Sequence, residues 1–220
     1  MRLLAARWVR IALVAVSLAA LAVELEIITD AQIARLAQQF GPVAKSRLTE
    51  WRGVLTNPKY KSLPEREKLE FVNNFMNQTP FVDDLKHWGK EDYWATPVEF
   101  LSTNAGDCED FSIAKYFTLR SLGVPDEKLR ITYVKELVIY NQAHMVLAYF
   151  PTPDAEPLIL DNINMTIRPA SARTDLLPVY SFNGSGLWLA KEQTGRGQSV
   201  GGSDRIGHWR DLQARLRAAM

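Results

Sequence analysis

Apolar residues recur every three or four positions through the first half of the chain, which is the spacing of amphipathic helices. Capping residues such as Thr29, and helix breakers such as Gly41 and Pro42, mark where these segments begin and end. The pattern predicts helices over about 30–40, 43–55, 64–76, 97–102 and 107–122.

The last of these segments differs from the others because few polar residues interrupt its apolar ones. A helix that is apolar around most of its circumference belongs in the core. Gly123 and Pro125 follow it, and both are typical of residues just beyond a helix end. We therefore expect the helix over 107–122 to be central to the fold.

The second half of the chain has the residue types and spacing of strands. Runs rich in β-branched and aromatic residues occupy 129–134, 143–150 and 158–162. Asn-Gly-Ser-Gly at 183–186 lies in the middle of 180–189 and predicts a hairpin there. Helices first and strands second are typical of an α+β fold with an antiparallel sheet.

The N-terminal end has the pattern of a secretory signal peptide. Arg2, Arg7 and Arg10 precede an uncharged stretch, residues 11–23. That stretch is shorter than the roughly 20 residues of a membrane-spanning helix. We expect residues 1–22 to be a signal peptide that directs the protein to the periplasm, with a retained N-terminal anchor as the alternative.

The remaining chain divides into one domain and a tail. Residues 23–193 contain the predicted helices and strands and form a single domain. The tail, 194–220, begins with a Gly-rich stretch typical of flexible linkers. Trp209, Leu212 and Leu216 then lie on one side of a short amphipathic helix.

Composition excludes several classes of function. Lys and Arg total 26 against 25 Asp and Glu, a net charge of +1, so no bulk positive charge attracts nucleic acid. The single cysteine, Cys108, excludes an intrachain disulfide and a cysteine-rich zinc cluster. An unpaired thiol in an oxidising compartment such as the periplasm therefore needs an explanation.

Cys108 lies at the start of the predicted central helix. The free N–H groups and the dipole at a helix N-terminus favour the thiolate, which is the nucleophilic form of cysteine. A buried structural cysteine is the commoner role of a single cysteine, and position alone leaves both interpretations open.

The strands supply residues that could activate such a thiol. His144 begins the strand over 143–150, and Asp161 follows an apolar run at the end of the next strand. Asp161 could accept a hydrogen bond from one ring nitrogen of His144 while the other ring nitrogen faces Cys108. This order of nucleophile, base and orienting acid predicts a catalytic triad, although each residue alone also has an ordinary structural role.

Three carboxylates, Asp107, Glu109 and Asp110, crowd around the same thiol. Without a counter-charge they would raise the pKa of Cys108. A hard divalent cation with oxygen ligands would neutralise them and favour the thiolate. Acidic residues at a helix N-terminus also interact favourably with the helix dipole, so their spacing alone leaves metal binding undecided.

Four motifs together support a family resemblance. GDCEDF at 106–111, AHMVL at 143–147 and LDN at 160–162 occur in this order, and YWATPVEFL at 93–101 precedes them. Over about residues 50–190 the chain resembles the bacterial transglutaminase-like cysteine proteinase family.

The resemblance implies a papain-like, transglutaminase-type fold with N-terminal helices and a catalytic helix packed on an antiparallel sheet. It implies a peptidase with Cys108 as nucleophile, His144 as general base and then acid, and Asp161 orienting the imidazole. It also implies calcium dependence, with Asp107, Glu109 and Asp110 as the metal-binding residues.

Members of this family cut large surface adhesins at paired alanines in the N-terminal region, and the cut releases the adhesin and disperses a biofilm. The resemblance therefore implies an adhesin as substrate. It also implies an inner-membrane receptor of the LapD type, which binds cyclic di-GMP and sequesters the protease, as a second partner. We expect this chain to bind neither nucleic acid nor cyclic di-GMP directly.

The sequence alone leaves other classes of function open. The same triad could transfer an acyl group to an amine, since water and lysine can both resolve a thioester. A noncatalytic binding module on the same fold is a third possibility. Trp94 could donate its indole N–H to an oxyanion, or it could be a core residue.

Overall fold

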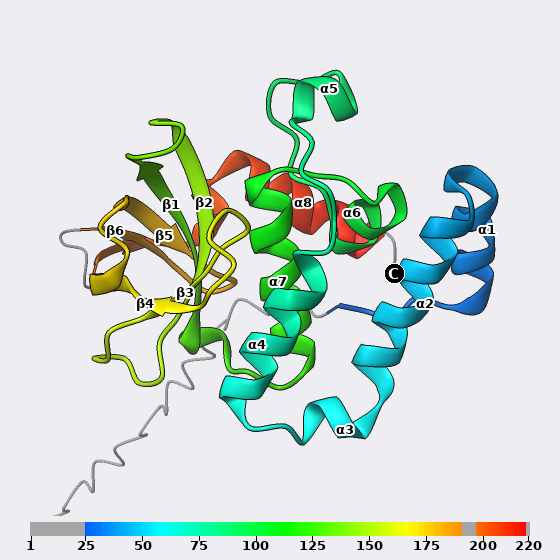
Figure 1. The fold of residues 1–220 in the computed structure, drawn as a ribbon, viewed down its shortest axis with the longest axis horizontal. Coiled ribbons are helices and arrows are strands. Elements are labelled where there is room, and N and C mark those ends of the chain that lie inside the picture. The colour runs from blue at the N-terminus through cyan, green and yellow to red at the C-terminus, as the bar shows by residue number, and fades with distance from the viewer. Residues whose placement is uncertain (1–24, 191–196, 219–220) are drawn as a thin grey trace, which may run out of the picture.

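A computed structural model describes residues 25–190 and 197–218 of the chain. The predicted signal peptide, residues 1–22, lies outside the described residues. The described part has helices on one side and a sheet on the other, with one helix between them (Figure 1). This arrangement confirms the predicted α+β fold. No described helix is both long and apolar enough to cross a membrane.

The helices predicted from the apolar spacing are all present. They are α1 (Asp30–Phe40), α2 (Pro42–Thr56), α4 (Glu65–Met76), α6 (Pro97–Thr103) and α7 (Cys108–Ser121). Two short helices were not predicted, α3 (Pro58–Lys61) and α5 (Asp84–Trp88). Helix α6 begins with a capping box, in which the side chains of Thr96 and Glu99 each accept a hydrogen bond from the other residue's backbone N–H.

Seven strands form one antiparallel sheet in the order β4-β3-β2-β1-β5-β6-β7 within the described residues. They are β1 (Leu129–Glu136), β2 (Ala143–Tyr149), β3 (Leu158–Leu160), β4 (Arg168–Pro169), β5 (Leu176–Phe182), β6 (Leu187–Leu189) and β7 (Gln198–Gly201). The hairpin predicted over 180–189 is the β5–β6 pair. The flexible linker predicted after residue 193 is partly wrong, because β7 pairs with β6.

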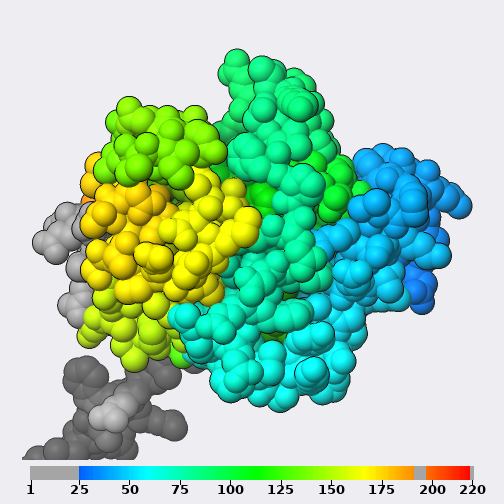
Figure 2. All heavy atoms as spheres, viewed as in Figure 1, coloured from blue at the N-terminus to red at the C-terminus, as the bar shows by residue number. Residues whose placement is uncertain are grey.

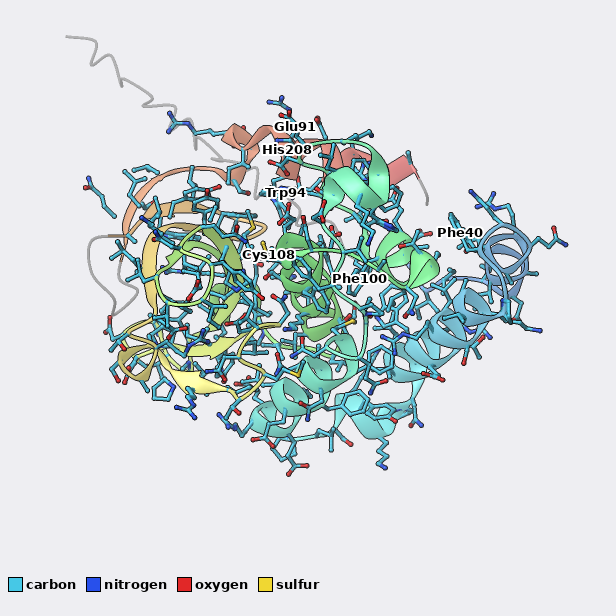
Figure 3. The ribbon with its side chains drawn as sticks, turned by 45° about the horizontal axis from the view of Figure 1, so that its top comes forward. Phe40, Glu91, Trp94, Phe100, Cys108 and His208 are labelled. Carbon is cyan, nitrogen blue, oxygen red and sulfur yellow. The ribbon has the colours of Figure 1, made fainter. Side chains whose placement is uncertain are left out.

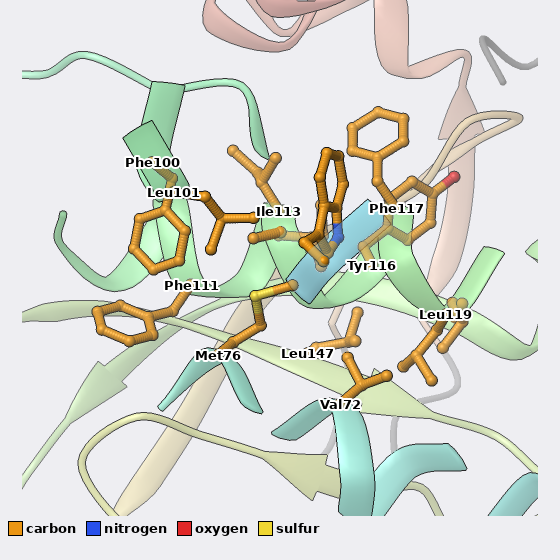
Figure 4. Close-up of a cluster of buried hydrophobic side chains, with 14 of the residues drawn as sticks. Val72, Met76, Phe100, Leu101, Phe111, Ile113, Tyr116, Phe117, Leu119 and Leu147 are labelled. Carbon is orange, nitrogen blue, oxygen red and sulfur yellow. The ribbon is translucent and has the colours of Figure 1, made fainter. Parts of the chain in front are cut away.

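Helix α7 lies at the centre of the core, as its apolar sequence predicts. It packs on the sheet with one side and on α4 and α6 with the others (Figure 4). Leu147 of β2 and Val72 of α4 lie side by side in this core (Figure 4). Trp51 of α2 is buried and donates its indole N–H to Thr118 Oγ1 of α7 at 2.9 Å. The helix that begins with Cys108 is therefore held on nearly every side.

The tail helix, α8 (Gly207–Ala218), is part of the same core. Trp209, Leu212 and Leu216, the apolar side predicted from the sequence, are buried. The Trp209 ring stacks on Phe117 of α7, with ring centroids 5.6 Å apart. The pattern predicted this helix, but it did not reveal that the helix packs against the core beside α7.

We predict that Trp209→Ala lowers the free energy of unfolding by about 3–5 kcal/mol, because it leaves a cavity against α7. Urea denaturation measures the change. Arg210→Ala, on the exposed side of the same helix, is the matched control and should change stability by no more than about 0.5 kcal/mol. Equal effects of the two substitutions would contradict the packing of α8 on the core.

Candidate active site and metal centre

Cys108 is the first residue of α7 and lies where this helix meets the sheet (Figure 3). Its side chain shares a hollow of about 340 Å³ with His144 at the start of β2, a volume in the range of ligand sites. The Cys108 thiol donates a hydrogen bond to Glu109 Oε2 at 3.0 Å. The structure thus brings Cys108 and His144 to one opening.

His144 and Asp161 are joined directly. Nε2 of His144 lies 2.8 Å from Oδ1 of Asp161, and both residues are buried. Asp161 follows β3, which pairs with β2, so sheet pairing holds the two residues at this distance. The same Oδ1 accepts the backbone N–H of Ile163 at 2.9 Å. Because Nε2 is engaged by Asp161, Nδ1 is the ring nitrogen left for a second group.

A residue that sequence analysis missed completes the surroundings of Asp161. Arg173 is only 2% exposed and donates from Nη2 to Asp161 Oδ2 at 2.7 Å. Its Nε and Nη2 also bind Asp175. Burial alone would raise the pKa of Asp161, but the bond and charge of His144, the Ile163 amide and Arg173 together lower it.

Lys115 is a second cation that was not predicted as a site residue. It lies on α7 two turns after Cys108, and its side chain is buried. Desolvation lowers the pKa of Lys115 to about 7, and the negative charge of Asp161 opposes that effect. A charged residue inside an otherwise apolar helix was the sequence signal that could have revealed it.

The predicted acidic residues gather at the N-terminus of α7, and two more join them. Asp84 lies within 4.8 Å of Asp107 and Asp110, measured between carboxylate oxygens, and Asp84, Asp92 and Glu109 form a second such group. Sequence analysis missed Asp84 and Asp92 because they precede α7 by many residues in a polar stretch without periodicity.

Backbone contacts fix this cluster in place. Residues 81 and 82 run beside Gly106, with the Val82 N–H donating to the Gly106 carbonyl at 2.9 Å, and this pairing brings Asp84 to the site. Asp110 Oδ1 accepts the Ala95 N–H at 2.7 Å. A Cβ atom at Gly106 would lie only 2.5 Å from Asp110 Oδ2, so the close approach requires glycine.

Burial and like charge raise the pKa of the groups at the N-terminus of α7. Desolvation, followed by the charge of Glu109, raises the pKa of Asp107 to about 9. Desolvation also raises the pKa of Glu109 to about 7 and raises that of Asp110. The pKa of the Cys108 thiol is raised by desolvation and then by the charges of Glu109 and Asp107.

The acidic cluster fits a hard cation. Oδ1 of Asp84 and Oδ1 of Asp107 are both buried without a hydrogen-bond partner, although buried carboxylate oxygens are normally satisfied. Several carboxylate oxygens within reach of one another are the ligand set that calcium prefers. These residues could therefore hold calcium, and the ion would satisfy the oxygens that the protein leaves unpaired.

Trp94 does not share the hollow with Cys108. It is buried, and its ring stacks between Phe182 and His208 with centroid distances of 5.5 Å to each. Figure 3 shows Trp94 and His208 beside each other. The position favours the core role of Trp94 over the alternative of an oxyanion donor.

Known proteins share this architecture. The model of the family "bacterial transglutaminase-like cysteine proteinase" matches residues 54–191. Three solved structures of LapG from Legionella pneumophila are 46% identical and cover 86% of this chain and 98–99% of their own. Their TM-scores are 0.74 for an EGTA-treated form, 0.73 for a second structure and 0.72 for a calcium-bound form. No curated protein sequence matches.

We predict that Asp161→Asn lowers the free energy of unfolding at pH 7 by about 3–5 kcal/mol, because Arg173 loses a buried charged partner. The pKa of Asp161 in the folded protein is below its ordinary value of 3.8. The ionised Asp161 therefore contributes its full stabilisation above pH 3.8 and loses it as the pH falls below that value. The free energies of unfolding of the wild type and of Asp161→Asn should converge toward low pH.

Urea denaturation at pH 7, 5 and 3 measures this difference. The exposed Asp211→Asn is the control and should change stability by about 0.5 kcal/mol or less. A difference between wild type and Asp161→Asn that stays constant down to pH 3 would contradict the ion pair.

Proposed function

Because this chain belongs to the bacterial transglutaminase-like cysteine proteinases, we propose that it is a calcium-dependent endopeptidase of the periplasm that cleaves a surface adhesin. The observation that carries the proposal is a single hollow containing Cys108 and His144, with Asp161 hydrogen-bonded to His144 at 2.8 Å. A nucleophile, a base and an orienting carboxylate in this order are the requirements for acyl transfer through a thioester.

In the proposed reaction, Nδ1 of His144 takes the proton of the Cys108 thiol, and the sulfur attacks the carbonyl carbon of the scissile peptide. The C–N bond breaks as His144 returns the proton to the leaving amine. Water then attacks the thioester, His144 again accepts and returns a proton, and the acid product leaves. Asp161 holds the imidazole orientation and stabilises its charged form.

Asp107, Glu109 and Asp110 are proposed to hold calcium, with Asp84 and Asp92 as further candidates. The calcium-bound structure of the Legionella relative and the unpaired oxygens of this cluster support the assignment. Calcium, when bound, supplies positive charge beside a thiol whose pKa the bare carboxylates raise. The backbone bonds of Asp110 to Ala95 and Asp107 keep the cluster beside Cys108.

The proposed substrate is the N-terminal region of a large surface adhesin, cut at paired alanines, and its release would let cells leave a biofilm. The proposed regulator is an inner-membrane receptor of the LapD type, which sequesters the protease when it binds cyclic di-GMP. The 46% identity to LapG over nearly the whole relative supports both assignments.

We predict that Cys108→Ser and His144→Ala each abolish cleavage of a di-alanine-containing adhesin fragment while the protein stays folded, as far-UV circular dichroism would show. The reason is that each removes one group of the acyl-transfer machinery. Mass spectrometry of the products also separates hydrolysis, which gives two fragments, from acyl transfer, which gives a crosslink. His208→Ala, at a partly exposed histidine, is the control and should keep its activity. Cleavage by either active-site variant would disprove the assignment.

We predict that calcium raises the thermal unfolding temperature of the wild type and that EGTA reverses the rise. Binding at 100 times the Kd stabilises a folded protein by about 2.7 kcal/mol. Asp107→Asn and Asp84→Asn should lose most of this stabilisation, whereas Asp30→Asn, at a highly exposed side chain, should retain it. An equal calcium effect in all four proteins would place the ion elsewhere.

A further inference from the structure

Large apolar side chains are exposed around the opening that contains Cys108. In the connection between β1 and β2, Val138 is 74% exposed, Ile139 60% and Tyr140 58%. Phe81 and Met165, from two other segments, are also more than half exposed. Exposed apolar residues gathered at one place on a monomeric protein mark a binding surface rather than ordinary surface variation.

These residues surround two adjoining hollows. The hollow with Cys108 and His144 is bordered by Phe81, Tyr140 and Ile163. A second hollow is bordered by Val138, Ile139, Ile163 and Met165. Because Ile163 borders both, the two hollows are neighbours. Figure 2 shows the yellow-green β1–β2 connection and the green α5 segment on opposite sides of a notch.

Hydrogen bonds to its backbone hold the loop of residues 137–140, called here the apolar loop, in one conformation. The carboxylate of buried Glu136 accepts the backbone N–H groups of Val138 at 2.7 Å and Tyr140 at 2.6 Å, and those of Ile139 and Asn141 as well. The Leu137 N–H donates to the Asp175 carbonyl at 2.8 Å. A loop held this way presents its apolar side chains without losing much conformational entropy on binding.

Both charged groups at the second hollow are already engaged. Glu136 binds the amides of the apolar loop, and Asp175 binds Arg173. Among the described residues that border it, the hollow therefore has an apolar side, formed by Val138, Ile139, Ile163 and Met165, and a polar side whose two carboxylates are engaged. It suits an aliphatic or aromatic side chain rather than a charged one.

We propose that the apolar loop and Met165 bind an apolar side chain of the protein substrate within a few residues of its scissile bond. The inference rests on the proposed proteolysis. The occupant is the substrate because the second hollow lies next to the one with Cys108, separated from it by Ile163. A chain whose carbonyl reaches that sulfur lies in the hollow that Ile163 borders, so its neighbouring side chains come within reach of the apolar loop.

The test uses fluorescent peptides with a central Ala-Ala that carry either Leu or Ser at the flanking positions. Their affinity for the calcium-loaded Cys108→Ser protein is measured by polarisation, so binding is scored without any cleavage. We expect the Leu peptides to bind about tenfold more tightly or better, the usual discrimination of an apolar pocket. Val138→Ser with Ile139→Ser should abolish this preference.

The matched control is Val43→Ser with Ile27→Ser, the same residue types at sites that are each 51% exposed and do not border either hollow. It should keep the preference for Leu. A missing preference, or one that survives in the apolar-loop variant, overturns the inference and leaves the surface to another protein partner. Failure of the wild type to cleave any of these peptides, with the binding preference intact, instead counts against the proposed proteolysis.

Discussion

The crowding of negative charge at the N-terminus of α7 is the constraint on which the rest of the site depends. Asp84, Asp107, Glu109 and Asp110 are brought together with little water around them, and each carboxyl has a raised pKa. The protein leaves two of their oxygens without partners. Such a cluster is unfavourable alone and favourable around a cation, and the proposed control of Cys108 by calcium rests on this property.

The elements around the cluster are arranged to hold it. Arg215 of α8 donates to the Tyr93 hydroxyl at 2.9 Å and to Glu99, and it also binds the Trp94 carbonyl. The next residue, Ala95, donates its N–H to Asp110. Through these contacts, a helix more than 100 residues away along the chain supports the start of α7. Beside His144, the buried Arg173 helps to keep Asp161 negative for its contact with the imidazole.

Local signals were enough to predict the main helices and strands, the helix cap at Thr29 and the candidate residues Cys108, His144 and Asp161, because each lies in a short motif or at a predicted element end. They failed where a residue reaches the site through a distant contact. Asp84 arrives through the pairing of residues 81 and 82 with Gly106, and Arg173 through an irregular connection after β4. Contacts of this kind leave no periodic pattern in a single sequence, so they could not be predicted from it. The apolar side of α8 was predicted, but the surface that it covers was not.

The rate at which iodoacetamide alkylates Cys108 at pH 7 tests the central claim most directly, because the chain has one cysteine and the reagent needs no substrate. Intact-protein mass spectrometry would follow the reaction in calcium and in EGTA, for the wild type and for His144→Ala. A calcium-gated thiolate predicts fast labelling only for the wild type in calcium, with a difference of about tenfold or more. The same rate in calcium and EGTA would contradict control of Cys108 by the acidic cluster, and uniformly slow labelling would identify a structural cysteine.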